Sequence, residues 1–272
     1  MNKYIYLRKG KYIVKNDKES ILLFYNYFLD KSVLFGYSNL SKNISRFIYN
    51  MLNLSIKVLY LPFLFDVFFK TKKLETNFLI KRYGGGNWSS KINLIKDNSG
   101  NYKIIKMYKS KKDADKEVSY IDKYKGKNNN FVLPKYKRIN ENTIEFNFIQ
   151  DLNLWVKLKL NYIKKNEIIN LFEKFSQELN KIYGNKKCLI HGDLFPINIY
   201  CIKDKFHIID FNDSHKYYPD FDRYIFLKNI LRVSYGYCDH TILQKYFSKK
   251  TIEEFEKHYQ MCYLNKHGNT TK

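Results

Sequence analysis

Two short apolar runs in the C-terminal half each end at polar side chains, and this pattern most restricts how the chain can fold. One run leads into Asp193, and Asn198 follows five residues later. The other, Phe206–Ile209, ends at Asp210. Short apolar runs bounded by turn residues are typical of buried strands. The pattern therefore predicts two carboxylates and one amide held at the ends of strands.

This set of groups suits phosphoryl transfer, in which one carboxylate accepts the proton of a hydroxyl while an amide and a second carboxylate hold Mg²⁺. The letters HGDLFPIN and IIDF around these residues resemble the Brenner-type motif of the aminoglycoside phosphotransferase, choline kinase and lipopolysaccharide-core kinase superfamily. The resemblance implies ATP and Mg²⁺ as cofactors. It also implies Asp193 as the catalytic base, Asn198 and Asp210 as metal ligands, and His191 as a structural brace.

Residues farther upstream resemble the nucleotide-binding part of the same superfamily. The glycine-rich stretch Gly84, Gly85 and Gly86 lies between two predicted strands, where backbone N–H groups can approach phosphates. Lys106, on the predicted strand Tyr102–Tyr108, resembles the lysine that contacts the α- and β-phosphates. Glu117, on the helix that follows, resembles its acidic partner.

Other positions are interpreted by their place in the same pattern. Phe148–Asp151 occupies the place of the hinge whose backbone meets adenine. Asp222, in the segment PDFDRY, resembles the aspartate that stabilises the catalytic loop from the start of a helix. Asp213, His207 and His215 are interpreted as loop and strand residues rather than as ligands.

The changing periodicity along the chain predicts three regions. Residues 1–75 form an N-terminal extension of unknown role, 76–150 a nucleotide-binding lobe and 151–272 a catalytic lobe. The fold class that the resemblance implies is α+β and bilobal, like a protein kinase. It would have a small antiparallel-sheet N-lobe, a mainly helical C-lobe and the extra N-terminal region.

Several elements of these regions are predicted individually. Tyr4–Leu7 and Lys11–Val14 are strand-like, and Lys111–Tyr124 is a helix that Ser110 caps. The runs 131–138 and 143–149 are expected to pair as a hairpin.

Composition limits the partners and the compartment. A formal net charge of +23 favours phosphate-bearing ligands or an anionic membrane surface. Nucleic acid is disfavoured, because neither zinc-finger spacing nor a ribonucleoprotein-type aromatic motif is present. No uncharged run approaches the length of a membrane-spanning helix. The four cysteines lack a CxxC pair, which argues against a zinc site and favours a reducing compartment: Cys188, Cys201, Cys238 and Cys262.

The acceptor is inferred from what the chain lacks. HGD replaces the HRD of protein kinases, and few residues separate Phe211 from PDFDRY, which disfavours a protein acceptor. The short stretch from Ile149 to His191 resembles that of the lipopolysaccharide-core sugar kinases, and this resemblance implies a sugar or lipopolysaccharide-type glycan as acceptor. Together with the positive charge, it leads us to expect a cytoplasmic protein bound peripherally at the inner face of the membrane. Two alternatives stay open: a kinase for choline, an aminoglycoside or a free sugar, and an inactive kinase fold that serves as a binding module. The oligomeric state is left undetermined.

Overall fold

The computed structural model describes most of the chain, and the ranges it covers are 2–7, 12–28, 50–51, 71–74, 78–82, 90–184 and 186–267. The chain divides into two compact units. The first comprises Met1–Ala114 and Pro134–Leu152, and the second comprises Asp115–Leu133 and Asn153–Lys272.

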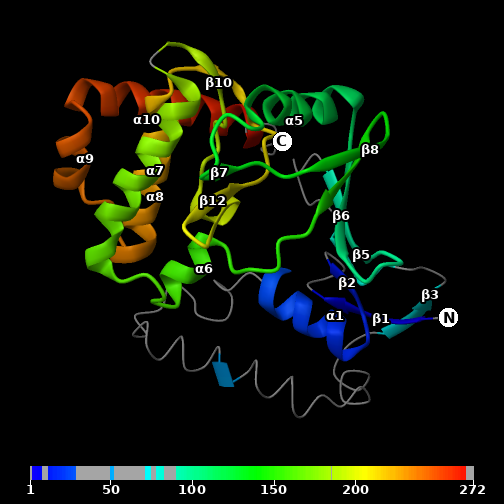
Figure 1. The fold of residues 1–272 in the computed structure, drawn as a ribbon. Coiled ribbons are helices and arrows are strands. Elements are labelled where there is room, and N and C mark those ends of the chain that lie inside the picture. The colour runs from blue at the N-terminus through cyan, green and yellow to red at the C-terminus, as the bar shows by residue number, and fades with distance from the viewer. Residues whose placement is uncertain are drawn as a thin grey trace. The chain divides into compact units, whose positions relative to one another are not determined.

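The first unit is built on one antiparallel sheet of eight strands in the order β3-β1-β2-β4-β5-β6-β9-β8 (Figure 1). The strands are β1 (Asn2–Leu7), β2 (Tyr12–Lys15), β3 (Thr71–Leu74), β4 (Ile80–Arg82), β5 (Ser90–Lys96), β6 (Tyr102–Tyr108), β8 (Tyr136–Asn140) and β9 (Thr143–Asn147). An Asx turn joins β5 to β6, because Asp97 Oδ1 accepts hydrogen bonds from the amides of Ser99 and Asn101. Strand β6 pairs with β5 along one edge and with β9 along the other, so it is an interior strand of the sheet.

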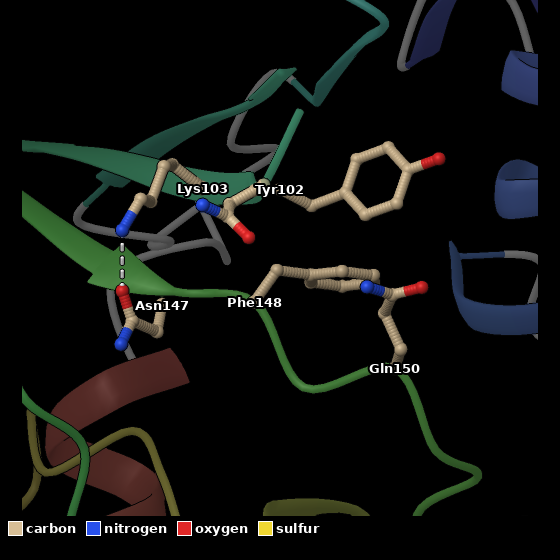
Figure 2. Close-up of a pocket in the computed structure, with 6 residues that line it drawn as sticks. Tyr102, Lys103, Asn147, Phe148 and Gln150 are labelled. Atoms are coloured by element: carbon tan, nitrogen blue, oxygen red, sulfur yellow. Dashed lines mark hydrogen bonds between the residues drawn. The ribbon is translucent and has the colours of Figure 1, made fainter. Parts of the chain in front are cut away.

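Side chains on β6 alternate between the two faces of the sheet, as in any strand. Lys103 and Lys106, three residues apart, consequently lie on opposite faces. Lys103 Nζ donates to Asn147 Oδ1 on β9 at 2.6 Å (Figure 2). This fixes Lys103 away from the face that Lys106 occupies.

The N-terminal segment belongs to the same sheet. The predicted strands at residues 4–7 and 11–14 are confirmed as β1 and β2, which pair with each other. Helix α1 (Lys18–Leu23) follows, capped where Asp17 Oδ1 accepts from the Ser20 amide at 2.7 Å, and continues as a π-helix, η1 (Phe24–Phe28).

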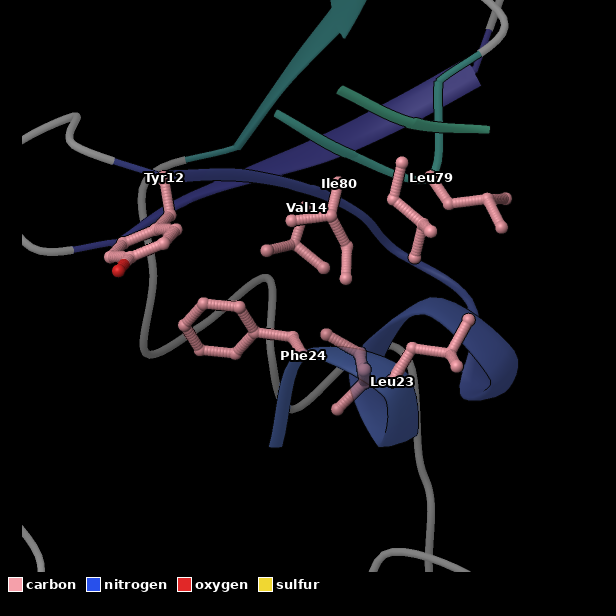
Figure 3. Close-up of a cluster of buried hydrophobic side chains, with 8 residues drawn as sticks. Tyr12, Val14, Leu23, Phe24, Leu79 and Ile80 are labelled. Atoms are coloured by element: carbon pink, nitrogen blue, oxygen red, sulfur yellow. The ribbon is translucent and has the colours of Figure 1, made fainter. Parts of the chain in front are cut away.

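Helix α1 covers the sheet through one apolar cluster. Figure 3 shows side chains of the helix facing those of the strands. The cluster consists of Tyr12, Val14, Ile21, Leu23, Phe24, Leu79, Ile80 and Leu94. Full burial of an aliphatic side chain stabilises by roughly 1.5–3 kcal/mol, so this cluster ties the N-terminal segment firmly to the sheet. The three-region division of the sequence remains a prediction.

The second unit is mainly helical. Its helices are α6 (Leu154–Lys159), η2 (Lys165–Glu167), α7 (Ile168–Tyr183), η3 (Pro196–Asn198), α8 (Asp220–Tyr235), α9 (His240–Tyr246) and α10 (Lys249–His267). Two small sheets accompany them: β10 (Cys188–Ile190) with β13 (His215–Tyr217), and β11 (Ile199–Ile202) with β12 (Lys205–Ile208) and β7 (Phe131–Val132). The fold class is therefore α+β, as expected, with an antiparallel-sheet unit and a mainly helical unit.

Aromatic side chains form much of the core of the second unit. Phe175 on α7 lies 4.1 Å from Phe226 on α8, measured between ring centroids, and both are fully buried. Phe172, one turn earlier on α7, also packs against Phe226. The apolar spacing of α7 predicts this buried face, and the helix ends at Gly184.

Helix α5 (Lys111–Tyr124) begins in the first unit and continues into the second. Its predicted bounds are confirmed, as is the cap: the Asp113 amide donates to Ser110 Oγ at 3.2 Å. The hairpin predicted from residues 131–138 and 143–149 is partly wrong. Pro134 lacks an N–H and interrupts the first run, so β7 pairs with β12 and only β8 pairs with β9.

Among the described helices, none has both the length and the apolar character needed to cross a bilayer.

Candidate active site

The loop that carries Asp193 starts directly after β10. It ends in η3, which has Pro196 in its first turn, where a missing N–H costs nothing. The hairpin of β11 and β12 then reverses the chain through Lys203 and Asp204, both with positive φ. This reversal brings Ile209 back beside the loop.

A closed circuit of hydrogen bonds joins the loop to the end of β12. The Asp193 amide donates to His191 Nδ1 at 3.2 Å, and His191 Nε2 bonds the Ile209 carbonyl at 3.0 Å. The Ile209 amide donates to the Asn198 carbonyl at 3.0 Å, and Asn198 Nδ2 donates to the Asp193 carbonyl at 2.9 Å. Because Asp210 follows Ile209 directly, all three polar positions predicted from the sequence are held by one network.

The tautomer of His191 follows from this circuit. A carbonyl can only accept, so Nε2 carries the hydrogen, and Nδ1 is the acceptor for the Asp193 amide. The ring is fully buried. His191 therefore joins the two segments that end at Asp193 and Asp210, which is the bracing expected from the sequence.

Asp210 has a φ of 65°, in the left-handed region that aspartate tolerates better than most residues. Its Oδ1 accepts from Asn212 Nδ2 at 2.8 Å. The Oδ1 of Asn212 is buried and accepts no hydrogen bond, so a further oxygen acceptor lies beside Asp210.

Asp222, in the first turn of α8, holds the main chain of the loop that carries Asp193. Its Oδ2 accepts from the His191 amide at 2.7 Å and its Oδ1 from the Gly192 amide at 2.8 Å. Burial raises the pKa of Asp222, while the nearby His191 and the hydrogen bonds from Gly192 and Tyr183 act in the opposite direction. The expected structural role of Asp222 is confirmed by these contacts.

A cluster of buried tyrosines supports the same loop and was not identified from the sequence. Tyr183 donates to Asp222 Oδ2 at 2.8 Å and is hydrogen-bonded to Tyr120 on α5. The Tyr120 ring stacks on Phe211, the residue after Asp210, at 4.5 Å. Burial raises the pKa of Tyr120 and Tyr183 well above the usual range, so both stay protonated. The sequence did offer one sign of this cluster: Glu117 and Tyr120 are three residues apart on the predicted helix, so both lie on the same helix face.

Lys106 and Glu117 are both buried, which separates them from the many surface lysines and glutamates of this chain. Lys106 is 6% exposed, and its Nζ lies 5.2 Å from the ring centroid of Tyr108. Glu117 is 2% exposed on the part of α5 that belongs to the second unit. Charged side chains are rarely buried without a compensating partner, so these two positions differ from ordinary surface charges.

The segment predicted as the hinge continues from β9. The Phe148 amide donates to the Tyr102 carbonyl at 3.1 Å, and the two rings meet edge to face. A pocket of about 350 Å³ lies here, lined by Asn101, Tyr102, Lys103, Asn147, Phe148 and Gln150 (Figure 2). Lys106 is not among its lining residues. The glycine-rich stretch Gly84, Gly85 and Gly86 lies outside the described residues.

Comparisons with solved structures find low identity. Aminoglycoside phosphotransferase APH(2'')-Ib with ADP bound is 12% identical, with 71% of this chain and 86% of that chain covered and a TM-score of 0.49. The Rio2 kinase–ADP/Mg²⁺–phosphoaspartate complex from Chaetomium thermophilum is 16% identical, with 68% and 70% covered and a TM-score of 0.44. Macrolide 2'-phosphotransferase MphH from Brachybacterium faecium is 7% identical, with 57% and 74% covered and a TM-score of 0.36. No curated protein matches the sequence.

A comparison with protein families is decisive. The family described as the RIO domain matches residues 66–259, which is most of the chain. RIO domains are atypical kinase domains, so the resemblance to kinase-like phosphotransferases seen in the sequence is confirmed. This chain belongs to the RIO domain family.

Proposed function

We propose that this chain is an ATP-dependent phosphotransferase that moves the γ-phosphoryl group of ATP to a hydroxyl of a non-protein acceptor, a sugar or glycan. The observation that carries the proposal is the hydrogen-bond circuit through His191, Ile209 and Asn198. It joins the main chain at Asp193, Asn198 and Ile209 in one network, which supports the proposal because phosphoryl transfer depends largely on the positioning of such groups.

Asp193 is the proposed catalytic base. Its carbonyl accepts from both Asn198 Nδ2 and the Phe195 amide, and its own amide is bound to His191. With the main chain fixed on both sides, the carboxylate is restricted to a small set of positions. There it would orient the acceptor hydroxyl and take its proton.

Asn198 and Asp210 are the proposed ligands of Mg²⁺. Asn198 uses its amide nitrogen to bind the loop, which turns Oδ1 of the same group in another direction. Amide and carboxylate oxygens are the hard ligands that Mg²⁺ prefers, and one or two protein ligands suffice beside nucleotide phosphates. The residues present therefore fit the ion, which would neutralise charge on the transferred group when bound.

Lys106 and Glu117 are the proposed nucleotide-binding pair. A lysine buried on an interior strand is suited to contact phosphate oxygens, because anionic oxygens offset the cost of burying its charge. Glu117 is the proposed acidic partner of that lysine. Gly84, Gly85 and Gly86 remain predicted as the phosphate-covering turn.

The proposed acceptor class follows from the segment between Asp210 and α8. Residues 211–219 are all that connect them, and β13 occupies part of this stretch. This leaves no room for the long activation segment with which protein kinases hold a polypeptide. Family membership favours a protein acceptor as the competing reading. The charge of +23 further favours an anionic, lipid-linked glycan at the inner face of a membrane.

The test is to identify the product. The protein is incubated with Mg²⁺ and γ-labelled ATP together with lipid-linked glycans, free sugars, choline, an aminoglycoside or a basic protein. Mass spectrometry then locates the label. We expect a phosphorylated sugar hydroxyl. Label found only on protein would overturn the acceptor proposal, and bound ATP without transfer to any acceptor, water included, would favour the binding module.

A further inference from the structure

Two histidines and a cysteine, residue types that can bind a metal ion, lie close together in the second unit. His215 comes from β13, while His258 and Cys262 lie one turn apart on α10. Their ligand atoms all lie within 4.8 Å of one another. The two histidine Nε2 atoms are 2.9 Å apart, and Cys262 Sγ is 3.6 Å from His258 Nε2. Two separate elements thus bring imidazole and thiol groups to one point.

The tautomer of His215, taken as a neutral ring, leaves Nε2 available as a ligand. Its Nδ1 bonds the Asp213 carbonyl at 2.8 Å, and since a carbonyl only accepts, Nδ1 carries the hydrogen. Nε2 then presents a lone pair toward His258. A ring N–H bound to a backbone carbonyl is the support that metal-binding histidines usually have.

Packing fixes the ring of His258. It stacks on Tyr217 at 3.7 Å between centroids with an interplanar angle of 4°, and Phe221 meets its edge at 4.8 Å. Burial, and then the proximity of His215, lower the pKa of His258, which favours the neutral form that binds metals. Packing against Tyr217 and Phe221 therefore positions the His258 ring without a bound metal ion.

The two distances from His258 Nε2 to the other ligand atoms approach those of tetrahedral zinc. Zn–N bonds of about 2.05 Å and a Zn–S bond of about 2.3 Å put nitrogen about 3.5 Å from sulfur and the two nitrogens about 3.3 Å apart. The observed nitrogen–sulfur distance of 3.6 Å matches. The 2.9 Å between the two nitrogens is a hydrogen-bond distance that would have to widen by about 0.4 Å.

We propose that His215, His258 and Cys262 form a binding site for a divalent transition metal ion of the zinc type. The ion takes the place of the hydrogen between the two Nε2 atoms, and that hydrogen is carried on Nδ1 of His258 instead. The Cys262 thiol releases its proton to solvent. Three protein ligands leave a fourth position for water, and the mixture of imidazole and thiolate favours zinc over Mg²⁺.

The site would tie α10 to the strand pair that carries the active-site loop. His215 pairs with Ile190, the residue before His191. Gly192 packs against the same ring, because a Cβ built there would lie 2.7 Å from His215 Nδ1. Metal binding would thus fasten the C-terminal helix behind the loop.

Direct metal binding tests this proposal without reference to phosphoryl transfer. Untagged, chelator-treated full-length protein is titrated with Co²⁺ under reducing conditions. We expect one ion per chain with a thiolate-to-cobalt charge-transfer band, and displacement of that ion by Zn²⁺. Cys262→Ser should abolish the band and weaken binding more than about tenfold, as should His258→Gln and His215→Gln.

Matched controls come from the neighbouring hairpin. Cys201→Ser on β11 and His207→Gln on β12 should leave the titration unchanged. A Cys262→Ser variant that binds Co²⁺ like the wild type would overturn the proposal, and so would a wild type that shows no charge-transfer band.

A second measurement needs no variant. Zn²⁺ should slow the alkylation of Cys262 in the wild type while Cys188, Cys201 and Cys238, which are also partly buried, react as before. Equal rates for Cys262 with and without Zn²⁺ would contradict the proposal.

Discussion

At the scale of single residues, several residues of the motif around Asp193 act by forming hydrogen bonds that hold the loop. His191 and Asp222 never need to touch a substrate, because their task is to hold the main chain of the loop. The carboxylate of Asp222 accepts hydrogen bonds from the amides of His191 and Gly192, and the residue is fully buried. A buried group with several partners is costly to replace, even by an isostere.

Asp222→Asn tests whether Asp222 stabilises the loop through these hydrogen bonds. The asparagine side chain keeps only one of the two oxygens. Its NH₂ group would therefore face one of the backbone amides of His191 and Gly192, which would lose its acceptor. We expect a loss of about 3 kcal/mol in the free energy of unfolding. The matched control is Asp220→Asn, which removes an exposed ion pair with Arg223 and should cost less than about 1 kcal/mol. Urea denaturation measures both, and similar losses would show that Asp222 is not a brace.

Gly192→Ala tests the close approach behind the loop. Gly192 has a φ of 79°, and a Cβ there would lie 2.4 Å from the Asp213 carbonyl oxygen, so the backbone must shift. Gly236→Ala is the control, because its φ of 86° is similar but nothing lies within 4 Å. The control should cost about 1–2 kcal/mol for conformation alone, and Gly192→Ala clearly more. Equal urea midpoints would contradict this packing.

At the scale of elements, the sheet of the first unit depends on the N-terminal strands and on α1. Ile80 on β4 is fully buried beneath α1, whereas Ile139 on β8 is 51% exposed. Ile80→Ala should therefore lower the free energy of unfolding by about 2–5 kcal/mol, and Ile139→Ala by much less. Thermal and urea unfolding of both variants check this. A small effect at Ile80 would mean that the N-terminal segment is not part of the core.

The attachment of α1 should also depend on pH. Hydrogen bonds from Lys96 and then Tyr102 lower the pKa of Glu19 below its usual value of 4.5. Because the folded-state pKa is depressed, the stabilisation is present above about pH 4.5 and is lost as the pH falls below it. Glu19→Gln should flatten the fall in urea midpoint between pH 5 and pH 3, by comparison with the wild type. An unchanged profile would contradict the assignment.

Local sequence signals predicted elements better than they predicted partners. The spacing of α5 and α7 gave both helices, because periodicity and caps act within a few residues. Pairing of β7 with β12, and the tyrosine cluster at Tyr120 and Tyr183, join residues far apart in sequence. Only the fold brings such residues together.

At the scale of the whole molecule, the features on which the proposals rest differ in how easily the sequence alone reveals them. Asp193, Asn198 and Asp210 were visible from the sequence because one motif carries all three within a short stretch. The cluster of His215, His258 and Cys262 was not, since a search for paired cysteines overlooks ligands from a strand and a distant helix. The charge of +23 belongs to the entire chain and favours anionic partners without selecting one.

We propose that Asp193 acts as the catalytic base of phosphoryl transfer, and Asp193→Asn tests this proposal most directly. The variant is compared with the wild type and with Asp204→Asn, a change in an exposed turn. Binding of Mg·ATP and single-turnover transfer of its γ-phosphate, to an acceptor or to water, are measured separately. We expect Asp193→Asn to lower the transfer rate roughly 10²- to 10⁴-fold while nucleotide affinity is kept, with Asp204→Asn matching the wild type. Transfer by Asp193→Asn at the wild-type rate would contradict the account.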